Sequence, residues 1–218
     1  EYIIPKPFDR RVLIWEAADV AEAAVMEGIA AISAEEFDKQ AYRESLEARL
    51  GMSYSVMRGV FNQVKGRKKK IVFPEGDHEK VIRAAAQCIE QDICQPILLG
   101  NVKSIREKMA ELNIEFDCEI TNPRYDDRRI GDYDLKLLEN RSRKGMTIVD
   151  AQRLLKSRPY FAAQMVEQGD ADGFLGGISR NYADVLRPCL EVIGSDEDSH
   201  CAIGCYMMVV KGRLIFLG

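Results

Sequence analysis

The chain has 218 residues, of which 46% are hydrophobic and 30% charged, and its formal net charge is −4. This is the composition of an ordinary globular protein of one or two domains, and no segment approaches the roughly 18 uninterrupted apolar residues that a membrane span needs. The first residues, EYIIPKPFDRR, lack a basic segment followed by an apolar one, so they are not typical of a signal peptide. We therefore expect no membrane partner.

Residues 9–33 carry apolar side chains at helical spacing, with Asp9 a candidate amino-terminal cap and Gly28 close to the predicted end. A charged amphipathic stretch follows over residues 34–50, and residues 52–64 form a further short predicted helix. The first residue is not Met and the sequence begins inside an apolar segment. We therefore expect this chain to be a piece of a longer one.

The segment KGRKKK, residues 65–70, is the only dense basic cluster of the chain and marks a boundary in its organisation. It precedes the apolar sequence IVFP, and a solvated loop that enters a strand explains it better than a nucleic-acid site. The slightly acidic balance of the remainder gives no positive surface for DNA or RNA. We therefore expect no nucleic-acid partner.

From residue 70 onward, short apolar runs alternate with amphipathic helices. The predicted strands are residues 71–73, 96–100 and 116–120, with one helix between the first two strands and another over residues 101–112. The order β-α-β-α-β predicts parallel strands joined by crossover helices, and therefore an α/β fold with a parallel sheet.

The second half continues this alternation. We expect helices over residues 133–143, from Thr147, from Pro159 and over residues 181–193, and strands over residues 171–175, 202–210 and 213–217. Thr147 and Asp150 have the spacing of a capping box, Pro159 suits a first helical turn, and residues 211–212 suit a hairpin turn. The last apolar strand has no following element to cover it, so we expect the domain to be incomplete at this end.

Six cysteines are scattered along the chain without a CxxC pair. The spacing His200-Cys201…Cys205 is compatible with a metal site, but the two cysteines lie in the apolar run CAIGCYMMVV, where cysteine is typical as a small hydrophobic side chain. We therefore expect no metal site. Free thiols without a secretory signal indicate a cytoplasmic protein.

The catalytic motifs that a sequence can reveal are absent from these residues. We find no GxGxxG after a strand, no GxxxxGK[ST], no HExxH and no GxSxG. His78 and His200 are far apart in the sequence and have no evident serine or cysteine partner. No residue of this chain is therefore assigned a catalytic role.

Three junctions between a predicted strand and the following loop are candidates for binding: FPEGD (73–77), TNPRYDDRR (121–129) and GFLGGISR (173–180). Ligands bind outside the carboxyl ends of the strands in parallel α/β sheets. In the third junction, Gly176 and Gly177 would let the backbone approach a ligand, while Ser179 and Arg180 add a hydroxyl group and a cation before a helix amino terminus. A tight turn without a ligand explains the glycines equally well.

Two arginines strengthen the binding hypothesis. Arg141 lies in ENRSRKGMT at a predicted helix end, close to Lys144, and Arg187 lies in VLRP within an otherwise apolar helix. A guanidinium group in such a setting needs an anionic partner, because an unpaired buried charge is costly. A phosphate or carboxylate of a ligand fits, since arginine binds both in a bidentate manner, and an internal carboxylate such as Glu191 is the alternative.

The sequences FPEGDHEKVIRAA, ENRSRKGMT, GDADGFLGG and VLRPCLEVIG resemble the phosphate acetyltransferase and butyryltransferase family over residues 67–218. The amino-terminal part, residues 1–33, is similar to the end of a bacterial malic enzyme catalytic domain, with a helical linker over residues 34–66. This order of parts resembles that of hybrid NADP-dependent malic enzymes. It implies a three-layer α/β/α phosphotransacetylase-like domain, incomplete at its carboxyl end and preceded by helices.

The resemblance implies that this module binds acetyl-CoA and inhibits malate oxidation in the attached domain. Its phosphate or CoA contacts would be Arg141 and Arg187, and the family's glycine-rich segment before the second arginine matches Gly173 to Ser179, followed by Arg180. NADP and a divalent metal (Mg or Mn) would belong to the malic domain, outside these residues. Homo-oligomers are also implied, a dimer of this part and a higher assembly of the whole.

The alternative is a working phosphate acetyltransferase. That reaction needs activation of the CoA thiol, and a thiol has a pKa of about 8.5. The family's later serine-arginine-aspartate segment would fall beyond Gly218, so this chain alone would not complete the reaction. A third hypothesis is a structural module that mediates only oligomerisation.

Overall fold

The computed structural model describes residues 10–49, 52–195, 201–210 and 213–218. Its contacts divide the chain into two compact units, one formed by residues 1–63 with 204–218 and the other by residues 64–203. The assignment of residues 1–33, 34–66 and 67–218 to separate functional parts stays a prediction.

The larger unit contains a parallel sheet of four strands in the order β3-β2-β1-β4. The strands are β1 (Lys70–Phe73), β2 (Gln95–Leu99), β3 (Glu119–Thr121) and β4 (Gly173–Phe174). All three pairings are parallel, with Val72 opposite Ile97 on one side and opposite Phe174 on the other. The predicted parallel α/β fold is therefore confirmed.

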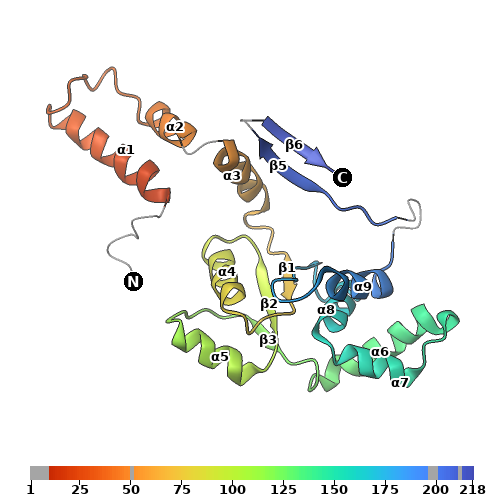
Figure 1. Ribbon diagram of the computed structural model, residues 1–218. Coiled ribbons are helices and arrows are strands. Elements are labelled where there is room, and N and C mark those ends of the chain that lie inside the picture. The colour runs from red at the N-terminus through yellow and green to blue at the C-terminus, as the bar shows by residue number, and fades with distance from the viewer. Residues whose placement is uncertain (1–9, 50–51, 196–200, 211–212) are drawn as a thin grey trace. The chain divides into compact units, whose positions relative to one another are not determined.

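Helices cover both faces of this sheet, as Figure 1 shows. They are α4 (Glu79–Glu90), α5 (Val102–Glu111), α6 (Asp127–Arg141), α7 (Ile148–Leu155), α8 (Arg158–Glu167) and α9 (Tyr182–Val192), with the short 3₁₀ helix η1 (Ser142–Lys144) after α6. Phe73 and Leu98 pack against the α4 and α5 side. Val72 and Leu99 pack against the core formed by α6 to α9. Since successive side chains of a strand point to opposite faces, alternate residues build the two cores of a three-layer α/β/α arrangement.

The local signals for helix termini are confirmed where the structure describes them. Thr147 and Asp150 form the predicted capping box at the start of α7, and proline lies in the first turn of α8. The predicted start of α6 at residue 133 is wrong: the helix begins at Asp127, because the side chain of Asp126 caps it by accepting a hydrogen bond from the Arg129 amide.

The two edge strands are shorter than the sequence predicts. β3 begins at Glu119 rather than at residue 116, and β4 consists of Gly173 and Phe174 rather than residues 171–175. Each of them pairs with one neighbour, whereas β1 and β2 pair on both sides. Phe116 and Cys118 pack against the core without extending the ladder, and Ala171 is buried, whereas Leu175 is 61% exposed.

The smaller unit contains the helices α1 (Arg10–Met26), α2 (Lys39–Arg49) and α3 (Met52–Val64) and the antiparallel hairpin of β5 (Tyr206–Val210) and β6 (Arg213–Leu217). Ile14, Ala18 and Leu46 are buried between α1 and α2. Helix α1 ends earlier than the predicted residue 33, and Gly28 follows it with a φ of 72°. The predicted cap Asp9 and hairpin turn 211–212 lie outside the described residues. Among the helices of the described part, none has the length and apolarity needed to cross a bilayer.

Candidate functional site

The carboxyl ends of β1 and β4 lie side by side and bring the first and third predicted junctions together. The chain continues from β1 to β2 on one side, while β4 lies on the other side of β1, so the strand order reverses at this point. Ligands of open α/β sheets bind outside the carboxyl ends of the strands at such a reversal. The segment that joins β4 to α9, residues 175–181, is called the glycine loop below.

A buried carboxylate holds the glycine loop. Glu75, which is 4% exposed, accepts hydrogen bonds from the amide groups of Gly177 (2.7 Å), Ile178 (3.0 Å) and Ser179 (2.7 Å) and from the Ser179 hydroxyl group (2.6 Å). Burial alone raises the pKa of this carboxyl group, but the hydrogen bonds from Ser179, Ile178 and Gly177 outweigh burial and lower the pKa to about 2. Glu75 is therefore ionised at neutral pH.

The glycines of this loop meet two different steric demands. Gly177 has a backbone φ of 104°, which residues other than glycine rarely adopt. A Cβ atom on Gly176 would lie 2.9 Å from the Phe174 ring and 3.4 Å from Pro74.

The three amide donors of the glycine loop already have an anionic partner inside the chain, Glu75, which could not be anticipated from the sequence. That Gly176, Gly177 and Ser179 contact an acyl-CoA stays a prediction.

The two predicted arginines lie on neighbouring helices around one tyrosine. The Tyr160 hydroxyl group, from α8, donates a hydrogen bond of 2.5 Å to Glu191 of α9. Arg141 Nη2, at the end of α6, lies 3.8 Å from Glu191 Oε1. Burial and the Glu191 carboxylate raise the pKa of Tyr160 to about 12, while the positive charges of Arg187 and Arg141 oppose that rise. Arg141, Tyr160, Arg187 and Glu191 therefore form one group, called the arginine cluster below.

The arginine cluster has spare capacity to bind an anion. Arg141 forms an ion pair with Glu191, but the distance of 3.8 Å is too long for a hydrogen bond. The Nε atom of Arg141 is buried and has no hydrogen-bond partner in the described structure. The Arg141 side chain as a whole is 19% exposed. Glu191 was the internal alternative for these arginines, and it is close to Arg141 without satisfying it.

Lys144 and Arg180 are exposed to solvent, in η1 and in the glycine loop respectively. Among the described residues, no hydrogen bond or ion pair joins either side chain to Glu75 or to the arginine cluster. The structure therefore places Arg141 beside Glu191 and groups Gly177 with Ser179. Arg187, like Lys144 and Arg180, is exposed to solvent, and it acts on the cluster through its positive charge near Tyr160.

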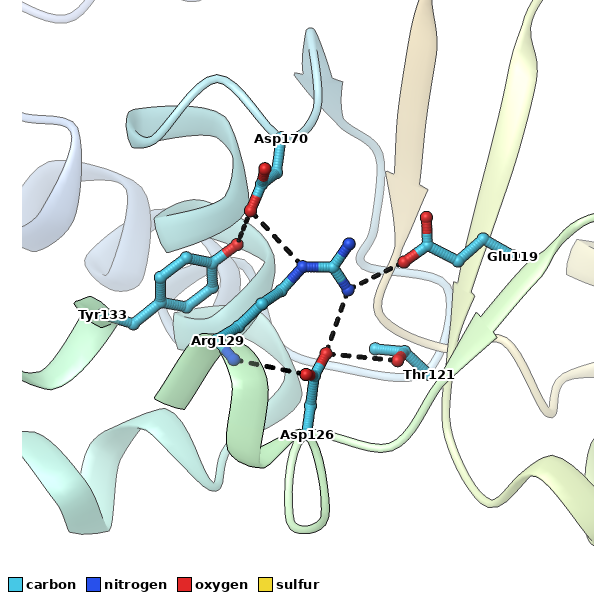
Figure 2. Close-up of polar contacts among 6 residues, drawn as sticks. All are labelled: Glu119, Thr121, Asp126, Arg129, Tyr133 and Asp170. Carbon is cyan, nitrogen blue, oxygen red and sulfur yellow. Dashed lines mark hydrogen bonds and ion pairs between the residues drawn. The ribbon is translucent and has the colours of Figure 1, made fainter. Parts of the chain in front are cut away.

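The second predicted junction, after β3, contains an ionic network around Arg129 (Figure 2). Arg129 Nη1 lies 2.7 Å from Glu119 and 2.9 Å from Asp126, and its Nε lies 3.4 Å from Asp170. The Tyr133 hydroxyl group donates to Asp170, and the Thr121 hydroxyl group donates to Asp126 at 3.3 Å. The Arg129 side chain is only 12% exposed; burial lowers its pKa, and the neighbouring carboxylates reverse that effect and raise it. These groups satisfy one another.

A second charged pair fixes the turn after β1. Arg158 of α8 donates to both carboxylate oxygens of Asp77, over 2.7 and 3.0 Å. The Arg158 guanidinium group lowers the pKa of Asp77, against the effect of burial. This bidentate contact joins the turn after β1, which carries Glu75, to the start of α8, which carries Tyr160.

A hollow of about 500 Å³ lies beside the ends of β2 and β3, lined by Asn101, Val102, Lys103, Ile120, Thr121, Asn122, Tyr125 and Asp126. None of the seven predicted binding residues lines it. We base the candidate site on the arginine cluster and not on this hollow, because the charged groups that could recognise an anion gather at the cluster.

The chain is similar to a known protein family in both sequence and fold. The sequence profile of the phosphate acetyl/butaryl transferase family matches residues 55–218. The chain belongs to this family. The predicted resemblance is therefore confirmed, and so is the phosphotransacetylase-like fold: a crystal structure of a phosphotransacetylase from Streptococcus pyogenes superposes with a TM-score of 0.70 and 31% identity, over 74% of this chain and 50% of that one.

Two curated relatives show both halves of the resemblance. An NADP-dependent malic enzyme from Rhizobium meliloti is 34% identical over 100% of this chain, which corresponds to 28% of that protein. A phosphate acetyltransferase from Corynebacterium glutamicum is 31% identical over 73% of this chain and 48% of that protein. The chain thus spans about a quarter of the first relative and about half of the second. The alignment with the malic enzyme includes the amino-terminal helices, whereas the family profile begins at residue 55.

Proposed function

We propose that this chain is an acyl-CoA-binding regulatory module, in which acetyl-CoA binds at the arginine cluster and inhibits an attached NADP-dependent malic enzyme. The observation that carries the proposal is Arg141 beside Glu191 and Tyr160 with an unpartnered buried Nε atom, while the positive charge of Arg187 acts on the same tyrosine. The similarity to malic enzymes over the entire chain supports the attachment.

The chemistry of the cluster suits the anionic part of acetyl-CoA. The phosphate groups of CoA present several oxygens, and a guanidinium group binds such oxygens in a bidentate manner. Arg141 offers a buried unpartnered Nε atom, while Arg187 is exposed on α9. The exposed Lys144 and Arg180 are candidates for further phosphate contacts at the rim, and the glycines at 176 and 177 would allow close approach of the ligand to the backbone.

Inhibition requires more than binding. A ligand couples two sites only if it binds one state of the protein better than the other. Malate oxidation would take place in the attached domain, with the NADP and the divalent metal that the relatives' type of enzyme implies. The present residues contain no dinucleotide fingerprint, so no residue of this chain is assigned to either cofactor. With free thiols in all six cysteines, we expect the whole protein to act in the cytoplasm.

The test replaces each arginine in the full-length protein. We expect Arg141→Ala and Arg187→Ala each to weaken acetyl-CoA binding by about tenfold or more, because each loses a charge-assisted contact worth about 1.5–3 kcal/mol. Isothermal titration calorimetry measures the affinity, and malate oxidation at increasing acetyl-CoA measures the inhibition. The concentration for half inhibition should rise with the dissociation constant.

Arg153→Ala is the matched control, since this arginine of α7 is 76% exposed and pairs only with Asp150 among the described residues. It should bind acetyl-CoA and be inhibited like the parent. If Arg141→Ala and Arg187→Ala also behave like the parent, the arginine cluster is not the binding site and the proposal fails.

A working phosphate acetyltransferase is the second candidate, favoured by the 31% identity to the Corynebacterium glutamicum enzyme. The full-length protein would then form acetyl-CoA from acetyl phosphate and CoA, which the thioester absorbance reports directly. Turnover without inhibition of malate oxidation would replace the regulatory proposal by this one. Failure of both assays, together with no binding of acetyl-CoA, would leave a module that serves assembly alone.

A further inference from the structure

Glu75 is an anion and is not one of the predicted binding residues, but it accepts four hydrogen bonds from the glycine loop. We propose that Glu75 is a positioning residue for the acyl-CoA site. Its carboxylate holds the glycine loop and thereby fixes the position of the start of α9, the helix that carries Arg187. The positioning role rests on the proposed function, since it presupposes that acyl-CoA binds beside α9.

The carboxylate is matched to the loop atom by atom. One oxygen accepts from the Gly177 and Ile178 amides, and the other accepts from the amide and hydroxyl groups of Ser179. A glutamine has nearly the same shape but keeps one accepting oxygen, and its NH₂ group would face amide donors. Four donors around one side chain therefore require the ionised carboxylate, not a polar group of the same size.

Glu75 is itself fixed from the other side. The next residue, Gly76, donates its amide to the Leu99 carbonyl over 3.2 Å, at the end of β2. A Cβ atom at Gly76 would lie 2.8 Å from the Leu98 Cβ and 2.9 Å from the Leu99 backbone nitrogen and oxygen. The backbone that carries Glu75 is thus pressed against the central sheet and has little freedom to follow a moving loop.

The loop passes this constraint on to α9. Asn181 has the extended backbone of a helix cap, but its side chain makes no capping hydrogen bond, so the usual side-chain anchor is missing at this helix start. The three amides held by Glu75 end at Ser179, two residues before Asn181. The chain that leads from the sheet to Arg187 is therefore held at Glu75.

The opposite ends of the same two strands provide a matched control. Asp172, just before β4, accepts hydrogen bonds from the Lys70 amide (2.8 Å) and from the Lys69 ammonium group (2.6 Å) at the start of β1. Asp172→Asn weakens the same strand pair without touching the glycine loop. It separates a specific effect on the loop from a general loss of sheet stability.

The experiment compares Glu75→Gln, the shorter carboxylate of Glu75→Asp, Glu75→Ala and Asp172→Asn in the full-length protein. Hydrogen exchange of the amides at 177–179 reports the loop, and calorimetry with acetyl-CoA reports the site. In Glu75→Gln we expect exchange to speed up and the dissociation constant to rise, each by about tenfold or more. Glu75→Asp should show the smaller effect of a retained charge, and Asp172→Asn should match the parent in both measurements.

Chemical rescue distinguishes a need for the anion from a need for the volume of the side chain. In Glu75→Ala, sodium formate can enter the space left by the carboxylate and should restore part of the slow exchange and part of the acetyl-CoA affinity. Sodium chloride at the same ionic strength should restore neither. This comparison remains decisive if Glu75→Gln folds poorly.

The outcomes separate the two proposals. If the parent binds acetyl-CoA and Glu75→Gln binds it equally well despite faster exchange, the positioning role is overturned while the proposed function stands. Equal loss of affinity in Asp172→Asn, or rescue by chloride as effective as by formate, also overturns it. If the parent itself does not bind acetyl-CoA, the proposed function fails.

Discussion

One nearly buried charge of the larger unit, Arg129, is met by several partners. Arg129 touches three carboxylates from three different parts of the chain, Glu119 at the start of β3, Asp126 before α6 and Asp170 after α8. A buried ion of this kind contributes little net stability as a pair, but removal of one partner leaves the others uncompensated. The network therefore fixes where these segments meet, which places the start of α6 beside the sheet.

Replacement of Arg129 tests this at the scale of one residue. We expect Arg129→Met to lower the free energy of unfolding by about 3–5 kcal/mol, because three carboxylates then lose their common cation in a partly buried place. Urea unfolding followed by circular dichroism measures the change. Arg83→Ala, which breaks an exposed pair with Glu79 on α4, should cost at most about 1 kcal/mol. Equal effects of the two substitutions would show that the network is no more than a surface feature.

At the scale of elements, the close contact of the turn after β1 with the end of β2 decides how the site is built. Gly76 lies against the backbone of Leu99, and it leaves no room for a side chain. Glu75 precedes it and Asp77 follows it, the first directed to the glycine loop and the second to Arg158 of α8. One tight turn thus connects β1, β2, β4 and α8.

A pair of glycine substitutions tests that element. We expect Gly76→Ala to lower the free energy of unfolding by about 1–3 kcal/mol or more, because the new methyl group would meet backbone atoms that cannot move aside. Gly131→Ala, within α6, should instead stabilise by up to about 1 kcal/mol, since nothing lies within 4 Å of its added Cβ atom and alanine favours a helix. Urea midpoints with slopes give both values. A neutral Gly76→Ala would contradict the tight turn.

At the scale of the whole molecule, the hairpin of β5 and β6 is the least covered element in the described part of the chain. Its strands expose large apolar side chains, among them Tyr206 at 71% and Phe216 at 63%. Exposed apolar area of this kind is typical of surfaces that bind another protein. We propose that a second copy of the 218-residue chain covers the hairpin, in line with the homo-oligomer that the family resemblance implies; a following element of a longer domain would compete for the same face.

Self-association of the 218-residue chain tests this proposal. Sedimentation velocity over a range of concentrations should show a dimer or larger species, and Phe216→Glu should shift it toward the monomer, because burial of the charge in the interface is costly. Val149→Glu, at an exposed position of α7, should leave the distribution unchanged. A parent that sediments as a monomer at every concentration would refute the proposal.

The kinds of elements, their order and the family could be predicted from the amino-acid sequence without a structure. Periods of about 3.6 and 2 residues in the apolar side chains are local properties, so α4, β2 and the capping box of α7 could be predicted without a structure. Four ordered motifs, from FPEGD to VLRP, identified the family. They also singled out Arg141 and Arg187, whose positive charges both act on Tyr160 in the fold, and binding of a ligand by these two arginines stays a prediction.

Tertiary structure alone decided which charges meet. Glu75 and Gly177 are 102 residues apart, and they meet because β4 pairs with β1 rather than with another strand. No local pattern fixes that strand order, since the backbone edge of each strand can form the same hydrogen bonds with any neighbouring strand. For the same physical reason, the partner of the glycine-rich amides could not be read from the sequence: hydrogen bonds and ion pairs depend on distances of a few ångströms, which only the packed sheet and helices define.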